Sequence, residues 1–360
     1  MVMGRRPEVA TASAPISAFA VAGLAAQLAT SLASVPFRRP WAGPAGRLHN
    51  VGTAVTRTVL RSFIGYATSL SIPEFRSVER LIDDVCRIVL PPFVKGLGVV
   101  VRNTSLGGVP VLEVLPRSGE PLGAILYLHG GGFIGTSPSM YAAFAGWIAH
   151  ETRCRVVVPD YRLAPEFPFP ASLLDALSVY DALRAEGLPA EELFVAGDSG
   201  GGNLATSLLV EALARGLPRP AGLILFSPEL SLTLDEPSVT ENADRDILPW
   251  NIPVRPYLHG IEPRDERVSV ADADLHRLPP TLVAFGGDEM FRDAIRRFVG
   301  RLERAGVATT ALEEPGMFHV FPILMPWADA STRVYRAVGA FVRERRLASR
   351  ARGRLGGVTL

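Results

Sequence analysis

A chain of 360 residues has room for one large domain, or for one domain with an appendage. Hydrophobic residues make up 48% of the sequence, which is enough for a sizeable core, and the formal net charge of +1 creates no bulk field that would attract nucleic acid. Two cysteines, Cys86 and Cys154, form neither a CxxC pair nor a metal-like cluster. Their apolar surroundings favour buried free thiols; the alternative, a disulfide, needs an oxidising compartment.

The N-terminal stretch from Val9 to Phe37 contains no charged residue and is flanked by pairs of arginines. Three interpretations are open. A signal peptide would use Arg5 and Arg6 as its basic end. A membrane span would need about 20 strongly apolar residues, and alanine, serine and threonine dilute this stretch. A helix that packs on the enzyme or lies at a membrane surface is favoured, because apolar residues recur every fourth position. These residues are Ile16, Ala20, Leu24, Leu28 and Leu32. The location, cytoplasmic or at the cell envelope, stays open.

Residues 36–48 are rich in proline and glycine and predict a linker. Residues 51–94 have helical spacing of apolar residues, and Pro91 and Pro92 are expected to end that pattern. Strands are then expected at residues 99–102, 109–115, 124–128, 155–159, 193–196, 223–226, 281–285 and 309–312. Helices are expected near residues 141–151, 173–183, 204–213, 291–305 and 334–342. This alternation predicts an α/β fold with a mostly parallel sheet and helices on both faces.

The strongest motif is Gly197-Asp198-Ser199-Gly200-Gly201, a GxSxG sequence between a strand-like and a helix-like segment. A sharp turn from strand to helix brings the backbone close to its neighbours, so that only glycine fits on both sides of the serine. The serine then stands at a helix N-terminus, where backbone N–H groups favour developing negative charge. We therefore predict that Ser199 is a nucleophile.

The sequence HGGGF at residues 129–133 directly follows an expected strand. Acyl transfer produces an oxyanion, and its hydrogen-bond donors must already point at it. Consecutive glycines let bare amides approach a substrate carbonyl. The expected donors are the amides of Gly131, Gly132 and Gly200, whereas His129 is expected to fix the loop by hydrogen bonding.

A serine nucleophile needs a base, and the base needs an orienting acid. In strand–GxSxG–helix enzymes the chain order is nucleophile, acid, base, and His319 follows the last expected strand in a loop. The acid should follow the strand expected at residues 281–285, where Asp288 would lie at the carboxyl edge of the sheet. Asp293 is the rival, but its place one turn into a helix favours a capping or solvent-facing role.

Several motifs in this order resemble the hormone-sensitive-lipase family of bacterial esterases. They are HGGGF (129–133), YRLAPE (161–166), GDSGGGNLA (197–205), GGDEMFRD (286–293) and the FHVF around His319. The resemblance covers about residues 95–345 and implies an α/β-hydrolase fold with about eight strands and a helical cap built largely from N-terminal residues. The resulting domain division is an apolar segment and linker (1–50), a helical cap (51–94), a catalytic domain (95–345) and a basic tail (346–360).

Two positions depart from the family pattern. The family usually has alanine after the nucleophile, where this chain has Gly200, and the amide needed for the oxyanion hole remains. The family usually has glycine after the base, where this chain has Val320, which is expected to reshape the pocket wall. The carboxylates of Asp198 and Glu166 are expected to be structural, and Glu166 to tie its loop to neighbouring backbone. The residues expected to support the motifs are His129, Gly130, Glu166 and Asp198.

The expected function is hydrolysis of carboxylic esters through an acyl-enzyme, with a small-molecule ester or lipid as substrate. No metal or organic cofactor and no nucleic acid is expected, and membrane contact would be peripheral, through the N-terminal segment. Amide or N-acetyl hydrolysis on the same triad stays open. A non-catalytic ligand-binding protein is disfavoured, because the hormone receptors that resemble this family have lost the base histidine and His319 is present.

Overall fold

The computed structural model describes residues 13–38, 46–249, 252 and 254–356. One eight-stranded sheet has the order β1-β2-β4-β3-β5-β6-β7-β8. Its strands are β1 (Val99–Leu106), β2 (Val109–Pro116), β3 (Ala124–Leu128), β4 (Arg155–Pro159), β5 (Leu193–Asp198), β6 (Gly222–Phe226), β7 (Thr281–Gly286) and β8 (Thr309–Glu314). β2 pairs antiparallel with β1 and with β4, and all other pairs are parallel. The predicted α/β-hydrolase sheet is confirmed.

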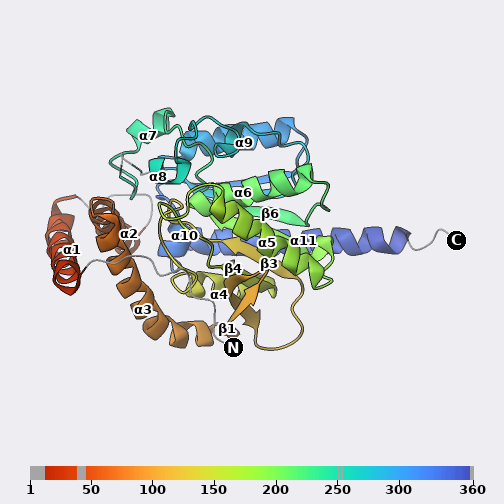
Figure 1. Cartoon of the computed structure of the whole chain (residues 1–360), viewed down its shortest axis with the longest axis horizontal. Helices are drawn as coiled ribbons and strands as arrows, with labels where there is room; N and C mark the ends of the chain where they lie inside the picture. Colours follow the sequence, from red (N-terminus) through yellow and green to blue (C-terminus); the bar gives the residue numbers. More distant parts are fainter. Residues whose placement is uncertain (1–12, 39–45, 250–251, 253, 357–360) are drawn as a thin grey trace.

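Helices cover both faces of this sheet (Figure 1). One face packs against α4 (Ala142–Thr152) and α11 (Asp329–Gly356), and the other packs against α5 (Ala171–Ala185), α6 (Ser199–Ala214) and α9 (Arg292–Arg304). Short helices α7 (Pro237–Glu241), α8 (Arg255–Leu258) and α10 (Phe321–Leu324) lie in the connections. Because both faces are covered, β3 to β7 are continuous apolar runs, as parallel strands require.

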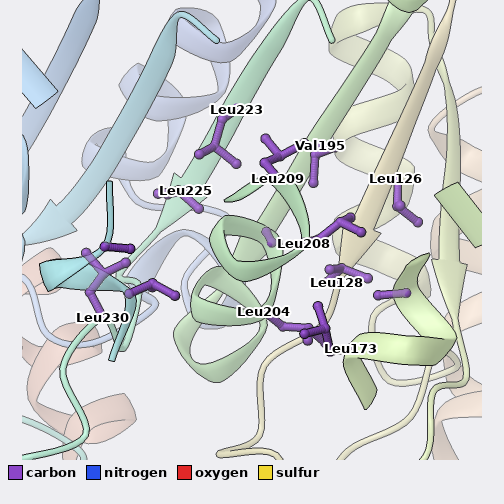
Figure 2. Packing of buried hydrophobic residues seen from close by; sticks show 14 of the residues in the cluster. Leu126, Leu128, Leu173, Val195, Leu204, Leu208, Leu209, Leu223, Leu225 and Leu230 are labelled. Atoms are coloured by element: carbon purple, nitrogen blue, oxygen red, sulfur yellow. The ribbon is translucent and has the colours of Figure 1, made fainter. Parts of the chain in front are cut away.

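The helix α6, which begins at the predicted nucleophile Ser199, is held by a leucine-rich contact with the central strands (Figure 2). Leu204 and Leu208 of α6 are fully buried against residues of β3, β5 and β6. The strand residues in this contact include Leu126, Leu128, Val195, Leu223 and Leu225. Truncating one such leucine to alanine typically costs about 2–5 kcal/mol of folding free energy, so the start of α6 is firmly positioned.

Three helices precede the sheet and form the cap: α1 (Ala14–Ser34), α2 (Arg47–Ala67) and α3 (Ile72–Gly96). α1 packs against both α2 and α3, and the Tyr66 hydroxyl donates a hydrogen bond to the Ala20 carbonyl at 2.8 Å. The hydroxyls of Ser31 and Ser62 also bond between α1 and α2. α1 therefore adds a third helix to the cap that was expected from residues 51–94.

Two helices extend beyond their expected ends. α3 does not stop at Pro91 and Pro92 but continues to Gly96. Val94, only 3% exposed, packs into the core beside α4 and β1, and this contact outweighs the hydrogen bonds that the prolines remove. At the other end, α11 runs to Gly356, so most of the expected basic tail prolongs a helix (Figure 1).

Both cysteines are free thiols, and burial raises the pKa of the Cys154 thiol to about 11. The prediction that both thiols are free is confirmed, whereas the prediction that both are buried holds only for Cys154, since Cys86 is partly exposed. The arginines proposed as the basic end of a signal peptide, and most of the predicted linker at residues 36–48, lie outside the described residues.

Candidate active site

Ser199, the predicted nucleophile, stands on a sharp turn between β5 and α6. Ser199 has a φ of 51°, in the left-handed region that non-glycine residues rarely occupy, and its side chain is nearly buried. A Cβ on Gly197 would lie 2.3 Å from the Gly201 carbonyl oxygen, and one on Gly201 would lie 2.1 Å from the Leu128 carbonyl oxygen. Glycine is therefore required on both sides of the serine.

The imidazole of His319 faces this serine. His319 Nε2 lies 2.9 Å from Ser199 Oγ, and the ring is 3% exposed. The residue lies in the loop between β8 and α10, and the Phe291 ring meets its imidazole edge-on at a centroid distance of 5.1 Å. This arrangement places His319 where a general base for Ser199 must lie.

The carboxylate beside His319 belongs to Glu289, which corrects the expectation of Asp288. Glu289 is fully buried, and its Oε2 lies 3.4 Å from His319 Nδ1. The Asp288 carboxylate instead turns toward the cap and lies 3.3 Å from Nη2 of Arg57 in α2. Asp293, the rival, accepts a hydrogen bond from the Ser238 amide and pairs with Arg292. Neither aspartate is recorded in contact with the imidazole.

The turn after β7 explains why Glu289 points inward. Its Oε1 accepts hydrogen bonds from the Gly286 amide and, at 2.6 Å, from the Ser227 hydroxyl. Ser227 Oγ in turn accepts the amide of Val320, the residue after His319, at 2.9 Å. The side chain of Glu289 is thereby captured on the buried side of the loop, which leaves the shorter Asp288 at the surface.

A second buried carboxylate, Asp246, joins the acid and base loops. Its Oδ1 accepts the backbone N–H of His319 at 2.9 Å, and its Oδ2 accepts that of Met290 at 2.8 Å. Burial raises the pKa of Asp246, while the His319 charge and these amides act in the opposite direction. No sequence pattern predicts a role for this residue, because it lies in an irregular segment with no motif.

The electrostatics of His319 suit a base. Burial alone would lower the pKa of the imidazole, but the hydrogen bond and charge of Glu289, with the charge of Asp246, outweigh burial and raise it. A raised pKa means that the protonated imidazole formed during serine attack is stabilised by its surroundings.

The glycine loop is tied to the nucleophile turn through Asp198. The Gly130 amide donates to Asp198 Oδ1 at 2.9 Å, and the hydroxyls of Tyr127 and Tyr141 also donate to this carboxylate, at 2.6 and 2.9 Å. Burial raises the pKa of Asp198 to about 6, although these hydrogen bonds oppose the shift. Asp198 is thus a structural link between the two motifs, and its recorded contacts do not include the His319 ring.

Gly131 and Gly132 follow this anchor. The Cα of Gly132 lies 3.3 Å from where a Cβ on Gly200 would be, so the loop rests directly on the nucleophile turn. Within the described part of the chain, no group is recorded as accepting a hydrogen bond from the Gly131 or Gly132 amide. The side chain of His129 bonds Thr136 Oγ1 at 2.9 Å and stacks on Tyr161 at a centroid distance of 4.3 Å, a loop-fixing role.

The cap is anchored to the same loop by a buried arginine. Arg76 of α3 pairs with the Glu166 carboxylate at 2.6 Å and donates to the carbonyls of Ala164 and Ile134 at 2.8 and 2.6 Å. Glu166 therefore ties its loop to the cap, with Arg76 as the intermediary to neighbouring backbone. These three contacts hold α3 against two loops, the one that follows the glycines of residues 130–132 and the one that contains Ala164 and Glu166.

Comparison with known proteins identifies the family of this chain. Residues 125–323 match the family of the alpha/beta hydrolase fold. The chain belongs to this family. An esterase of Acinetobacter venetianus is 31% identical over 79% of this chain and 94% of its own length. The carboxylesterase/phospholipase LipF of Mycobacterium tuberculosis is 28% identical over 83% of this chain and 82% of its own length.

Solved structures of the same family superimpose on the chain. A hormone-sensitive-lipase homologue from a metagenome library has a TM-score of 0.71 at 31% identity, covering 81% of this chain and 98% of the other. An esterase from the bacterial hormone-sensitive lipase family has a TM-score of 0.67 at 27% identity, covering 89% and 98%. The resemblance to that family is confirmed, and this α/β-hydrolase is a serine carboxylesterase.

Proposed function

We propose that this esterase cleaves its substrates with Ser199 as nucleophile, His319 as base and Glu289 as orienting acid. The observation that carries the proposal is the continuous contact from Ser199 Oγ to His319 Nε2, at 2.9 Å, and from His319 Nδ1 to the buried carboxylate of Glu289. A nucleophile, a base and an orienting group in this order are what hydroxyl activation requires.

In the first half of the reaction, Ser199 Oγ attacks the ester carbonyl carbon while His319 Nε2 takes the hydroxyl proton. The carbonyl oxygen becomes an oxyanion, which the amides of Gly131, Gly132 and Gly200 stabilise. The C–O bond to the alcohol then breaks, and His319 returns its proton to the departing alkoxide. The products of this half are the free alcohol and an acyl-Ser199 ester.

In the second half, water attacks the acyl-Ser199 carbonyl and gives one proton to His319. Collapse of the second oxyanion breaks the bond to Ser199 Oγ, which recovers the proton from His319, and a carboxylic acid leaves. Throughout, Glu289 accepts a hydrogen bond from the Nδ1 proton of the imidazole and so fixes its orientation. Asp246 accepts the backbone N–H of His319 and so fixes the position of its main chain. Glu289 stays ionised and stabilises the imidazolium.

The substrates are small-molecule esters, and short acyl chains are the first class to test. Relatives include an acetyl-hydrolase of Streptomyces hygroscopicus, 34% identical over 61% of this chain. The test is a p-nitrophenyl ester series from acetate to palmitate, with p-nitroacetanilide as the amide counterpart. Turnover of esters well above the amide supports ester hydrolysis. Comparable or faster amide turnover would favour the alternative, an amide or N-acetyl hydrolase on the same triad.

We also propose that α1 contacts a lipid surface. Among the described residues, the helix over Ile16–Phe37 is long and apolar enough to cross a membrane, with a mean hydropathy of 1.6. Only 11% of it is buried, unlike a core helix of a soluble protein. Phe19 is 79% exposed, and Ile16 and Leu32 are about half exposed. Because α1 is also bound to α2 through Tyr66, contact along the surface fits better than spanning.

A further inference from the structure

A buried glutamate lies beside the triad without taking part in it. Glu229 follows β6, and its side chain is 1% exposed. Its backbone N–H donates to the Ser199 carbonyl at 2.9 Å, and its carbonyl accepts Nδ2 of Asn203, in the first turns of α6, at 2.8 Å. The main chain of Glu229 is therefore bound directly to the segment that carries the nucleophile.

The side chain of Glu229, in contrast, is not satisfied. Its Oε1 is buried and has no hydrogen-bond partner within the described residues. The other buried carboxylates of the site, those of Asp198, Asp246 and Glu289, each accept two or more hydrogen bonds. A buried polar atom without a partner is costly and uncommon, and a group of this kind next to a nucleophile indicates a ligand contact.

The surroundings place this carboxyl close to the reacting groups. The charges of Glu229 and His319 act on each other, and the charge of Glu229 also acts on the Tyr257 hydroxyl. The Tyr257 ring stacks at 3.8 Å on Phe133, which ends the oxyanion loop. The carboxyl is thus within electrostatic reach of the His319 imidazole and of the Tyr257 hydroxyl.

We propose that Glu229 is a specificity residue that hydrogen-bonds a hydroxyl group of the ester substrate. This inference rests on the proposed ester hydrolysis at Ser199. Burial raises the pKa of Glu229 to about 7, so both its neutral and ionised forms are present near neutral pH. A hydroxyl can donate to the ionised form and can both donate to and accept from the neutral one, whereas an ammonium group loses its ion pair when the carboxyl is protonated.

The experiment measures kcat/KM for two matched substrate pairs. p-Nitrophenyl 3-hydroxybutyrate and p-nitrophenyl butyrate differ by a hydroxyl on the acyl side. Glyceryl monobutyrate and propyl butyrate differ by hydroxyls on the alcohol side. The enzymes are the full chain, Glu229→Leu, Glu229→Gln and the control Glu211→Leu, which makes the same change at a half-exposed position on α6.

For at least one pair, we expect Glu229→Leu to lower the ratio of kcat/KM for the hydroxylated ester to kcat/KM for the plain ester by about 10-fold to 100-fold. Glu229→Gln, which can still accept a hydrogen bond, keeps most of that ratio, and Glu211→Leu keeps all of it. Unchanged ratios for both pairs in Glu229→Leu would overturn the subsite, as would a fall in Tm of more than about 5 °C, which would reveal a structural carboxyl. Failure of the unmodified chain to hydrolyse any ester would instead overturn the proposed function.

Discussion

The imidazole of His319 and the carboxylate of Glu289 face each other in a fully buried contact, while the neighbouring Asp288 pairs with an arginine of the cap. The two adjacent carboxylates thereby point to opposite sides of the turn that follows β7. The inner one raises the pKa of the His319 imidazole, and the outer one pairs with Arg57 of α2.

Mutations should distinguish the role of Glu289 from that of Asp288. Glu289→Gln should lower kcat for p-nitrophenyl butyrate by about 10³-fold or more, because the imidazolium loses its counter-charge and the amide can also present a donor that favours the wrong imidazole tautomer. Asp288→Asn should keep most of the activity, since it removes only a partly exposed ion pair with Arg57. Steady-state kinetics on the purified variants measure both. The reverse pattern would return the acid to position 288.

The pH dependence follows from the raised pKa of His319. The base must be neutral to accept the serine proton, so kcat/KM should rise with pH along a limb centred above the ordinary histidine value of 6.5. In Glu289→Gln the main cause of the upward shift is removed, and the residual activity should show its acid limb at lower pH. An acid limb that stays in place in this variant would contradict the assigned contact.

The turn at Ser199 leaves more room for a side chain at Gly200 than at Gly201. Gly200→Ala should fold and keep activity within about tenfold, because its Cβ would meet Gly132 and Phe133 at 3.3 Å, which a shift of a few tenths of an ångström relieves. Gly201→Ala should lose about 3 kcal/mol or more, since its Cβ would overlap the carbonyls of Leu128 and His129. Thermal unfolding and ester turnover check this pair. Equal behaviour of both variants would contradict the geometry.

The membrane proposal is tested on the surface of α1. Replacing both Ile16 and Phe19 by Asp should reduce sedimentation with phosphatidylcholine vesicles by about tenfold or more, because burying a phenylalanine is worth about 1.5–3 kcal/mol. The control Leu174→Asp changes a similarly exposed apolar residue on α5 and should bind as before. Deleting residues 1–35 should also abolish vesicle binding and leave turnover of short esters largely intact. A mature protein that starts near Val35 would instead indicate a cleaved signal peptide.

Much of the fold could be predicted because its signals are local. The strands at residues 124–128 and 155–159 occur at the predicted residues, since each is a continuous apolar run next to turn-forming residues. α6 begins at Ser199, five residues before the helix expected near residues 204–213, because the glycines of its first turn have poor helix propensity and are helical only through the packing of the turn.

The site was predictable only in part. Motif and chain order predict Ser199 and His319 as a pair, and in the structure Ser199 Oγ lies 2.9 Å from His319 Nε2. The choice between Asp288 and Glu289 depends on which side chain is captured by Ser227, a contact from another strand end. Asp246 comes from a segment without any pattern, and its role depends on two backbone amides of distant loops. Such long-range contacts leave no trace in a single sequence.

The most direct test of the account is covalent labelling of the full chain with a fluorophosphonate, followed by peptide mass analysis and p-nitrophenyl butyrate kinetics. The account predicts stoichiometric labelling of Ser199 with complete loss of turnover. It also predicts that Ser199→Ala is unlabelled, with kcat lower by about 10³-fold or more. Labelling at another residue, or near-normal turnover in Ser199→Ala, would contradict the central claim.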